Sequence, residues 1–217
     1  MVPNERVVRT TIASLVVALA GGALFWRGTD GFRALTSEQA RRVAIAASPR
    51  TLPPVELEDQ DGNPFSLAAY RGRPVVVDFI YTQCTLACPL LSDAFQRIDR
   101  AEQATWGRDD GRRLPLVSIT FDSLDTPAQL RSYAGHYQAD GDTWRFARVR
   151  DPRDLAGLLR AFDIVVIPDP QGGFQHNAAV HVLDAGGRLS RVLDLGASPI
   201  DVARAAAEAS GARRQRR

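Results

Sequence analysis

Two cysteines and three histidines provide nearly all of the side chains in this sequence that could bind a soft metal or carry redox chemistry. The cysteines are Cys84 and Cys88, and the histidines are His136, His176 and His181. The chain contains no Lys, and its only Met is the first residue. Schiff-base chemistry, a P-loop lysine and thioether ligands are therefore excluded. Metal or redox chemistry in this chain must use these five side chains.

The two cysteines follow an apolar run typical of a buried strand and open a segment with helical periodicity. Backbone N–H groups at the start of a helix stabilise a thiolate, so we expect thiol pKa values below the usual ~8.5. The i, i+4 spacing predicts both sulfur atoms on one helical face, where they could bind Cu(I) or close a disulfide. The alternative is a pair of small buried hydrophobic residues, or a structural staple that constrains a very short loop.

The three histidines compete for the place of a third ligand. His176 follows a glycine-rich loop and precedes a predicted strand, and in a thioredoxin-like fold this loop packs against the start of the cysteine helix. His181 is five residues further on, so strand alternation predicts that it faces away from the site. His136 lies late in a predicted helix, where a polar tip suits the C-terminus. Three carboxylates could tune the site or cap a helix or turn: Asp78, Asp122 and Asp125.

An uncharged stretch of 17 residues lies between Arg9 and Arg27, at the short end of the ~17–25 residues that span a bilayer. Arg6 and Arg9 precede it, which favours an N-terminus in the cytoplasm, and Trp26 suits the membrane interface. A cleaved signal peptide with a site at 18–20 is the competing interpretation, but apolar residues continue past that site. Both interpretations place the rest of the chain outside the cytoplasm, on the periplasmic side of a bacterium or its equivalent. Cysteines there form disulfides unless they are reduced or bound to a metal.

Composition favours one globular domain with an appendage, since the 217 residues are 45% hydrophobic and 24% charged. The net charge is +2, and four of the last five residues are Arg, so no basic surface remains for nucleic acid. We predict four parts along the chain: a membrane anchor or signal peptide at 1–27, a linker at 28–50, a thioredoxin-like domain at 51–209 and a basic tail at 210–217.

The pattern of predicted elements gives the fold class. A helix is predicted over 36–47, and the domain then contains the following elements in order: a hairpin at 55–67 that turns at Asp61-Gly62, a buried strand at 73–81, a helix at 88–103, a buried strand at 114–121, a helix that opens at Thr126-Pro127, a helix at 152–162, a loop at 167–175, a hairpin at 178–195 and a closing helix at 200–209. This order predicts an α/β fold, a thioredoxin-like sandwich of a central mixed β-sheet with flanking helices.

From residue 52 to 207 the chain resembles the Sco/SenC family of copper-binding, thioredoxin-like proteins. Three segments carry the resemblance: GNPFSLAAYRGRPVVVDFIYTQCTLACP, VSITFDSLDTPAQLRSYA and QHNAAVHVLDAGGRL. The resemblance implies that Cys84, Cys88 and His176 bind Cu(I) in a three-coordinate site, and that Cu(II) can also bind. It further implies a membrane anchor, a copper donor, and a role in assembling the CuA centre of cytochrome c oxidase.

Three functions are compatible with these residues. The first is a membrane-tethered copper chaperone, not an enzyme, that passes Cu(I) by ligand exchange to a client metalloprotein such as the oxidase subunit carrying CuA. His176 must be neutral to bind, so its hold is expected to weaken below pH ~6.5. The second is an exported thiol–disulfide oxidoreductase in which Cys84 attacks and His176 is not needed. The third is a redox or copper sensor that binds a partner through the arginine tail.

Overall fold

The computed structural model describes residues 5–28, 36–85, 87–107, 113–170 and 172–211. The chain forms two compact units, Met1–Ala47 and Ser48–Arg217. The first unit contains helices α1 (Glu5–Gly28) and α2 (Ser37–Ala47). Within α1, Arg9–Gly28 is long and apolar enough to cross a membrane, a property that a signal sequence shares. The predicted apolar N-terminal helix is therefore present.

A capping box begins α2. The Thr36 hydroxyl accepts a hydrogen bond from the Gln39 backbone N–H at 3.2 Å, and the Gln39 side-chain oxygen accepts one from the Thr36 N–H at 3.3 Å. These reciprocal bonds satisfy N–H groups that have no partner within the helix. The sequence prediction of a helix over 36–47 is confirmed.

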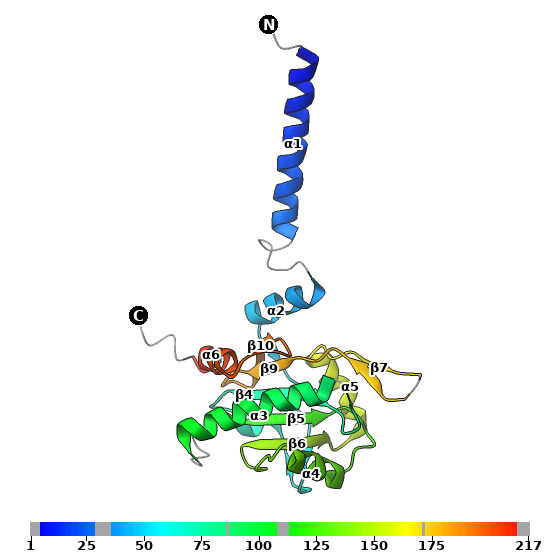
Figure 1. Cartoon of the computed structure of the whole chain (residues 1–217), viewed down its shortest axis with the longest axis vertical. Helices are drawn as coiled ribbons and strands as arrows, with labels where there is room; N and C mark the ends of the chain where they lie inside the picture. The colour runs from blue at the N-terminus through cyan, green and yellow to red at the C-terminus, as the bar shows by residue number, and fades with distance from the viewer. Residues whose placement is uncertain (1–4, 29–35, 86, 108–112, 171, 212–217) are drawn as a thin grey trace. The chain divides into compact units, whose positions relative to one another are not determined.

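The second unit is built on an eight-stranded mixed sheet with the order β1-β10-β9-β4-β5-β6-β2-β3. Strands β4, β5 and β6 are parallel and central, and the other neighbours pair antiparallel. Figure 1 shows β10, β9, β4, β5 and β6 side by side, with α3 lying across them. The strands are β1 (Arg50–Thr51), β2 (Leu57–Asp59), β3 (Pro64–Phe65), β4 (Val75–Ile80), β5 (Leu116–Thr120), β6 (Trp144–Val149), β9 (Val180–Leu183) and β10 (Arg188–Leu193).

Helices cover both faces of this sheet. They are α3 (Ala87–Trp106), α4 (Pro127–His136), α5 (Pro152–Ala161), α6 (Pro199–Ala209) and a short 3-10 helix, Leu67–Tyr70. On one face α3 packs against α6 and is joined to α4, where the Gln96 side chain donates to the Tyr137 carbonyl at 2.7 Å. On the other face Phe162, which follows α5, packs against Phe79 and His181. The predicted sandwich of a mixed sheet between helices is confirmed.

Strand β4 lies at the centre of the sheet and forms part of the hydrophobic core. All six of its residues are buried, as expected of a strand that is covered by helices on both faces. The hairpin β2–β3 around Asp61-Gly62 and the hairpin β9–β10 are present as predicted. Thr126 and Gln129 form a capping box at the start of α4, with Pro127 at its first position.

Two parts of the sequence prediction were wrong. Strand β6 was missed, although it is as long as β4 and four of its six residues are buried. The segment predicted as a loop at 167–175 is instead a hairpin of β7 (Val166–Pro168) and β8 (Phe174–His176). Its turn contains Gly172 and Gly173 at φ of 101° and 83°, a backbone conformation that glycine adopts readily. The predicted linker and basic tail fall partly outside the described residues, at 29–35 and 212–217, so those boundaries stay predictions.

Candidate metal centre

The two cysteines lie where β4 ends and α3 begins. Cys84 lies in the turn after the strand, where its N–H donates to the Tyr81 carbonyl at 3.2 Å. Helix α3 begins at Ala87, so Cys88 is in its first turn and Cys84 is outside the helix. The prediction that both lie on one helical face was therefore wrong. The two residues are brought together instead by the Cys88 N–H, which donates to the Cys84 Sγ at 3.2 Å.

A buried carboxylate anchors the cysteine turn. Asp125 accepts hydrogen bonds from the Thr82 N–H at 3.0 Å and from the Thr82 and Thr120 hydroxyls. It thereby ties the segment before Cys84 to the loop that follows β5. Asp122 has a local role, since it accepts from the Leu124 N–H at 2.9 Å within that loop.

The hairpin β7–β8 brings His176 to the cysteines. The His176 Nε2 lies 3.7 Å from the Cys88 Sγ, and the imidazole ring lies against Phe121 with 4.8 Å between ring centroids. The His176 Nδ1 is buried and has no hydrogen-bond partner. Burial lowers the pKa of His176, so the ring is neutral at neutral pH and its unprotonated nitrogen can bind a metal.

Both cysteines are free thiols, with Cys84 half-buried and Cys88 fully buried. Burial, and then the neighbouring Cys84 thiol, raise the pKa of Cys88, so this group is protonated at neutral pH. We expected the helix start to lower the thiol pKa values, and for Cys88 this prediction was wrong. Removal from water outweighs the favourable helix dipole at this position.

An aromatic cluster holds the hairpin against the end of β4. The Tyr81 hydroxyl lies 3.5 Å from the Phe174 carbonyl oxygen, to which it donates, and 3.4 Å from the Phe174 N–H, from which it accepts. The Tyr81 ring also packs against Phe121 and Phe174. A Cβ atom at Gly173 would lie 2.9 Å from the Tyr81 hydroxyl oxygen, so this contact requires a glycine. Sequence reasoning missed these residues, although large aromatic side chains directly after two buried strands were a usable signal.

The other two histidines lie elsewhere, as the sequence predicted. His136 is exposed at the end of α4, where its ring contacts Tyr137. His181 is fully buried in β9, and its Nδ1 lies 3.3 Å from the Val77 carbonyl oxygen. Neither residue is in a position to complete a site with the cysteines.

Asp78 is the remaining carboxylate that the sequence singled out, and it is completely buried in β4. Burial raises its pKa to about 7, and the Ser118 hydroxyl on β5 offsets only part of this effect. The carboxyl group is therefore uncharged over most of the acidic range. Asp78 is not a candidate metal ligand but a buried acid in the strand that leads to the cysteines.

The donor set fits a soft metal ion. Two thiols and one imidazole suit Cu(I), whereas hard ions prefer oxygen ligands. Among the described residues, no group of three or more His, Cys, Asp or Glu is already gathered tightly enough to hold a metal. The contacts are pairwise, Cys84 with Cys88 and Cys88 with His176. A bound ion would have to draw these three donors together.

A sequence profile described as SCO1/SenC matches residues 44–210. This chain belongs to the SCO1/SenC family. A SCO1 protein homologue of Bacillus subtilis is 24% identical over 140 residues, which are 63% of this chain and 69% of that protein. A candidate copper-binding protein of Stutzerimonas stutzeri is 34% identical over 98 residues, so the match spans 45% of this chain and less than half, 46%, of that protein.

Solved structures of Sco proteins share the fold of this family member. ScoI of Bradyrhizobium japonicum with copper bound superposes with a TM-score of 0.58 at 23% identity, covering 74% of this chain and 99% of that one. BsSco, described as having a disulfide switch and as a cytochrome c oxidase assembly protein, superposes with a TM-score of 0.62 at 21% identity, covering 75% and 95%. The thioredoxin-like fold that the resemblance to the SCO1/SenC family implied is thus confirmed.

Proposed function

We propose that this SCO1/SenC protein is a membrane-tethered copper chaperone that holds Cu(I) through Cys84, Cys88 and His176. The observation that carries the proposal is the 3.7 Å approach of the His176 Nε2 to the Cys88 Sγ, beside a Cys84 Sγ that accepts from the Cys88 N–H. Residues 88 positions apart in the chain meet here, one in the first turn of α3 and the other on β8 of the separate hairpin. The His176 Nδ1 is buried and has no hydrogen-bond partner, so no hydrogen bond through this atom accounts for the position of the half-buried ring.

The protonation states define how copper would bind. His176 is ready to bind at neutral pH because burial lowers its pKa. The pKa of Cys88 is raised, so Cu(I) must displace a proton from this thiol, and binding is expected to release that proton to solvent. The half-buried Cys84 is the ligand that an acceptor thiolate could displace first. Transfer would then proceed by exchange of one ligand at a time, without oxidation or reduction.

The partners follow from the family and from the first unit. We propose that the acceptor is the cytochrome c oxidase subunit that carries CuA, and that a separate protein donates the copper. The apolar stretch Arg9–Gly28 supports a membrane anchor, with the copper-binding domain outside the cytoplasm. A tether of this kind raises the effective concentration of the domain near a membrane-bound client. We keep the predicted parts, an anchor at 1–27, a linker at 28–50, a domain at 51–209 and a tail at 210–217, as part of this proposal.

The different burial of the two thiols favours thiol–disulfide reductase as a second candidate. Cys84 is half-buried and Cys88 is buried behind it. The Cys84 thiolate would attack a client disulfide and form a mixed disulfide, and Cys88 would then displace the client thiolate. The client disulfide gains two electrons and two protons, and Cys84 and Cys88 lose them to form a disulfide. This reaction does not require His176.

The test compares two activities on one client with the full chain in detergent. The client is the purified soluble CuA domain of a bacterial oxidase, used either as the reduced copper-free form or with its two ligand cysteines oxidised to a disulfide. We expect His176→Ala to reduce Cu(I) transfer strongly and to leave disulfide reduction intact, whereas Cys84→Ser abolishes both. His136→Ala is the matched control. Copper transfer by His176→Ala at the rate of the unmodified chain would contradict the chaperone proposal.

A further inference from the structure

A cavity of about 570 Å³ lies beside α5, within the unit Ser48–Arg217. Its walls come from the segment 52–57, the short 3-10 helix, Leu158 on α5 and Gly187 in the β9–β10 turn. None of the described residues that line it is a candidate metal ligand. Its volume falls within the ~300–1,000 Å³ that is usual for sites that bind small molecules.

The segment 52–57 forms a stiff wall of this cavity. Strand β1 ends at Thr51, which pairs with β10, and β2 begins at Leu57, which pairs with β6, so strands hold both ends of the segment. Pro53 and Pro54 lie between them, and their rings fix φ near about −65°. A wall that is already ordered loses little conformational entropy when a ligand binds.

The lining of the cavity is mostly aliphatic. Leu, Val, Pro and Ala make up eight of its twelve described lining residues, and none of the twelve is aromatic. Val55, Leu57 and Leu158 are buried, so they present apolar surface from the core. Aromatic walls favour flat rings because such rings stack on one another. Aliphatic walls suit a flexible alkyl chain instead.

One unpaired cation stands at the opening of the cavity. Arg71 is exposed, and within the described part of the chain its side chain has neither an ion pair nor a hydrogen bond. It lies over the β9–β10 turn, where a Cβ atom at Gly187 would be 3.6 Å from the Arg71 Cγ and Nε. The other charged lining residue, Glu56, is ion-paired with Arg150 at 3.1 Å. The Ser66 hydroxyl makes no capping bond to the 3-10 helix and is a second polar group of the lining.

We propose that this cavity binds an alkyl chain that ends in a carboxylate, with the chain against the aliphatic walls and the carboxylate on Arg71. Removal of the methylene groups from water supplies affinity. A guanidinium binds a carboxylate through two parallel N–H···O bonds, which selects the anionic end. A phosphate monoester carries nearly two negative charges, and the described lining holds one free cation. The inference does not depend on the proposed function, because the candidate copper ligands do not line the cavity.

The experiment maps where a photoreactive analogue of dodecanoate attaches to the full chain in detergent. Labelled residues are identified by mass spectrometry, and label on the apolar helix α1, which the detergent surrounds, serves as the internal reference. Ala68→Phe fills the cavity from an exposed position of the 3-10 helix. Ala69→Phe is the matched control, since Ala69 is also exposed on this helix but does not line the cavity.

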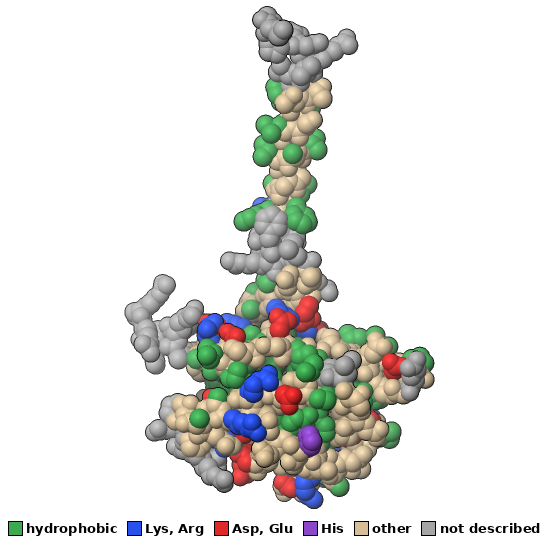
Figure 2. All heavy atoms as spheres, in the orientation of Figure 1, with side chains coloured by type: hydrophobic (Ala, Val, Ile, Leu, Met, Phe, Trp, Pro, Cys, Tyr) green, Lys and Arg blue, Asp and Glu red, His purple; other side chains and the backbone are tan. Residues whose placement is uncertain are grey.

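A second pair of variants tests the charge. Arg71→Gln removes the cation at the opening, and Arg97→Gln is its control. Arg97 is exposed on α3, on the face that Figure 2 shows, where basic and acidic side chains lie among apolar ones. The corresponding dodecanol analogue, with the same photoreactive group, is the uncharged probe.

We expect the dodecanoate probe to label residues 52–57 and 66–71, and unlabelled dodecanoate to displace it. Ala68→Phe should lose this label, and Arg71→Gln should bind dodecanoate at least about tenfold more weakly, because a hydrogen bond to a charged group is lost. Both control variants should match the unmodified chain, and the uncharged probe should label the cavity at least about tenfold less.

Absence of label from the cavity overturns the inference, as does label that neither Ala68→Phe nor Arg71→Gln reduces. Equal labelling by the dodecanol probe also overturns it, because the carboxylate would then play no part. A photoreactive phospholipid that labels the cavity in preference to dodecanoate would assign it to membrane lipid and overturn the proposed ligand. His176→Ala should label like the unmodified chain, which keeps this result separate from any failure of the copper site.

Discussion

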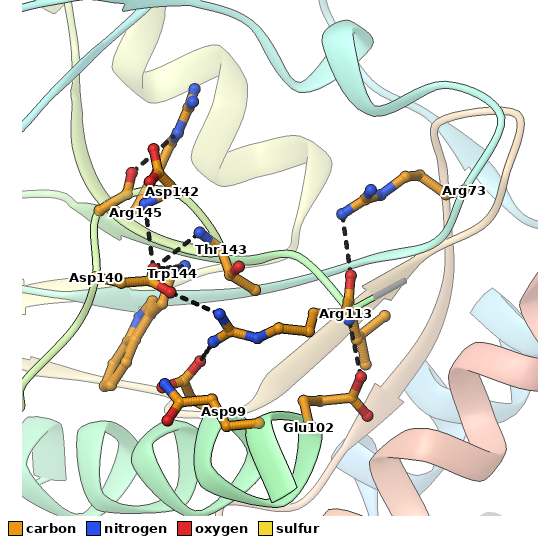
Figure 3. Close-up of polar contacts among 12 residues, drawn as sticks. Arg73, Asp99, Glu102, Arg113, Asp140, Asp142, Thr143, Trp144 and Arg145 are labelled. Carbon is orange, nitrogen blue, oxygen red and sulfur yellow. Dashed lines mark hydrogen bonds and ion pairs between the residues drawn. The ribbon is translucent and has the colours of Figure 1, made fainter. Parts of the chain in front are cut away.

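The parallel strands of the sheet begin at a cluster of ion-paired side chains and end beside the candidate metal centre. Buried polar groups are hydrogen-bonded to different extents at these two ends. At the starting end, Arg113 precedes β5 and reaches between α3 and the loop before β6 (Figure 3). It pairs with Asp99 on α3 and, at 2.8 Å, with Asp140. Its carbonyl also accepts from the Arg73 side chain at 3.0 Å.

The Asp140 carboxylate in this ion cluster accepts several hydrogen bonds. One oxygen of Asp140 accepts from the backbone N–H groups of Asp142, Thr143 and Trp144, and the other accepts from Arg113. At the opposite end of the strands, the buried His176 Nδ1 has no partner. Buried polar groups are normally satisfied because an unmade hydrogen bond is costly. The contrast teaches that the ion cluster is built for stability, whereas the metal centre leaves the His176 Nδ1 without a partner while the Nε2 of the same ring faces Cys88.

Breaking the ion cluster should have the largest effect on stability. Arg113→Met leaves the Asp99 carboxylate buried without its cation, which typically costs about 3–5 kcal/mol. We expect the free energy of unfolding to fall by this amount in urea denaturation followed by tryptophan fluorescence. The Cu(I) affinity of the folded fraction should not change, because the site lies at the other end of the strands.

Two further variants serve as controls for Arg113→Met. The double variant Arg113→Met with Asp99→Leu should recover most of the lost stability, because both charges are removed together. Arg153→Met breaks the exposed pair with Asp151 and should leave stability unchanged. An Arg113→Met variant as stable as the unmodified chain would contradict a structural role for the cluster.

The pH dependence of stability should come next in size, and Asp78 is its expected source. In the folded chain this carboxyl has a pKa raised to about 7 by burial, whereas in the unfolded chain it ionises near 4. The folded state therefore binds the extra proton, so the stability from this group is full below pH ~4 and is lost as pH rises through about 7. The full loss is no more than about 4 kcal/mol.

Asp78→Asn, whose amide does not titrate, should flatten this decline in the free energy of unfolding between pH 4 and pH 7. Asp93→Asn, an exposed carboxyl on the adjoining helix α3, should leave it in place. The comparison requires urea denaturation of the three proteins across that range. A decline that persists in Asp78→Asn would show that another group is responsible.

Much of the fold could be predicted from the sequence, and so could the proximity of the candidate site residues. Strand β4 and the capping boxes of α2 and α4 are local patterns, and their signals lie within a few residues. The approach of His176 to Cys88 was expected from the thioredoxin-like fold and from the family resemblance, and not from local pattern. What could not be predicted depends on packing: the pKa of Cys88 is raised by its burial, and the hairpin β7–β8 lies against Tyr81, a residue 93 positions before Phe174 in the chain. The apolar residues of β6, Trp144, Phe146, Ala147 and Val149, were a readable signal that was missed.

The glycine turn of the hairpin allows a finer test of how His176 is positioned. Gly172 and Gly173 both have positive φ, so alanine is strained at either position. Only at Gly173 would the added Cβ collide with the Tyr81 hydroxyl, since nothing lies within 4 Å of the corresponding atom at Gly172. We expect Gly173→Ala to weaken Cu(I) binding about tenfold more than Gly172→Ala does, a difference of about 1.4 kcal/mol. Equal affinities in a chelator competition would mean that the Tyr81 contact does not position the histidine.

The most direct test of the central claim is the Cu(I) affinity of the fully reduced chain, measured anaerobically against a chromogenic chelator. The three histidines supply their own controls, because His176 approaches Cys88 whereas His136 is exposed on α4. The account predicts tight binding of one ion per chain, substantial weakening in His176→Ala and no change in His136→Ala. A reduced chain that fails to compete for Cu(I), or a His176→Ala variant with unchanged affinity, would contradict the three-ligand copper site.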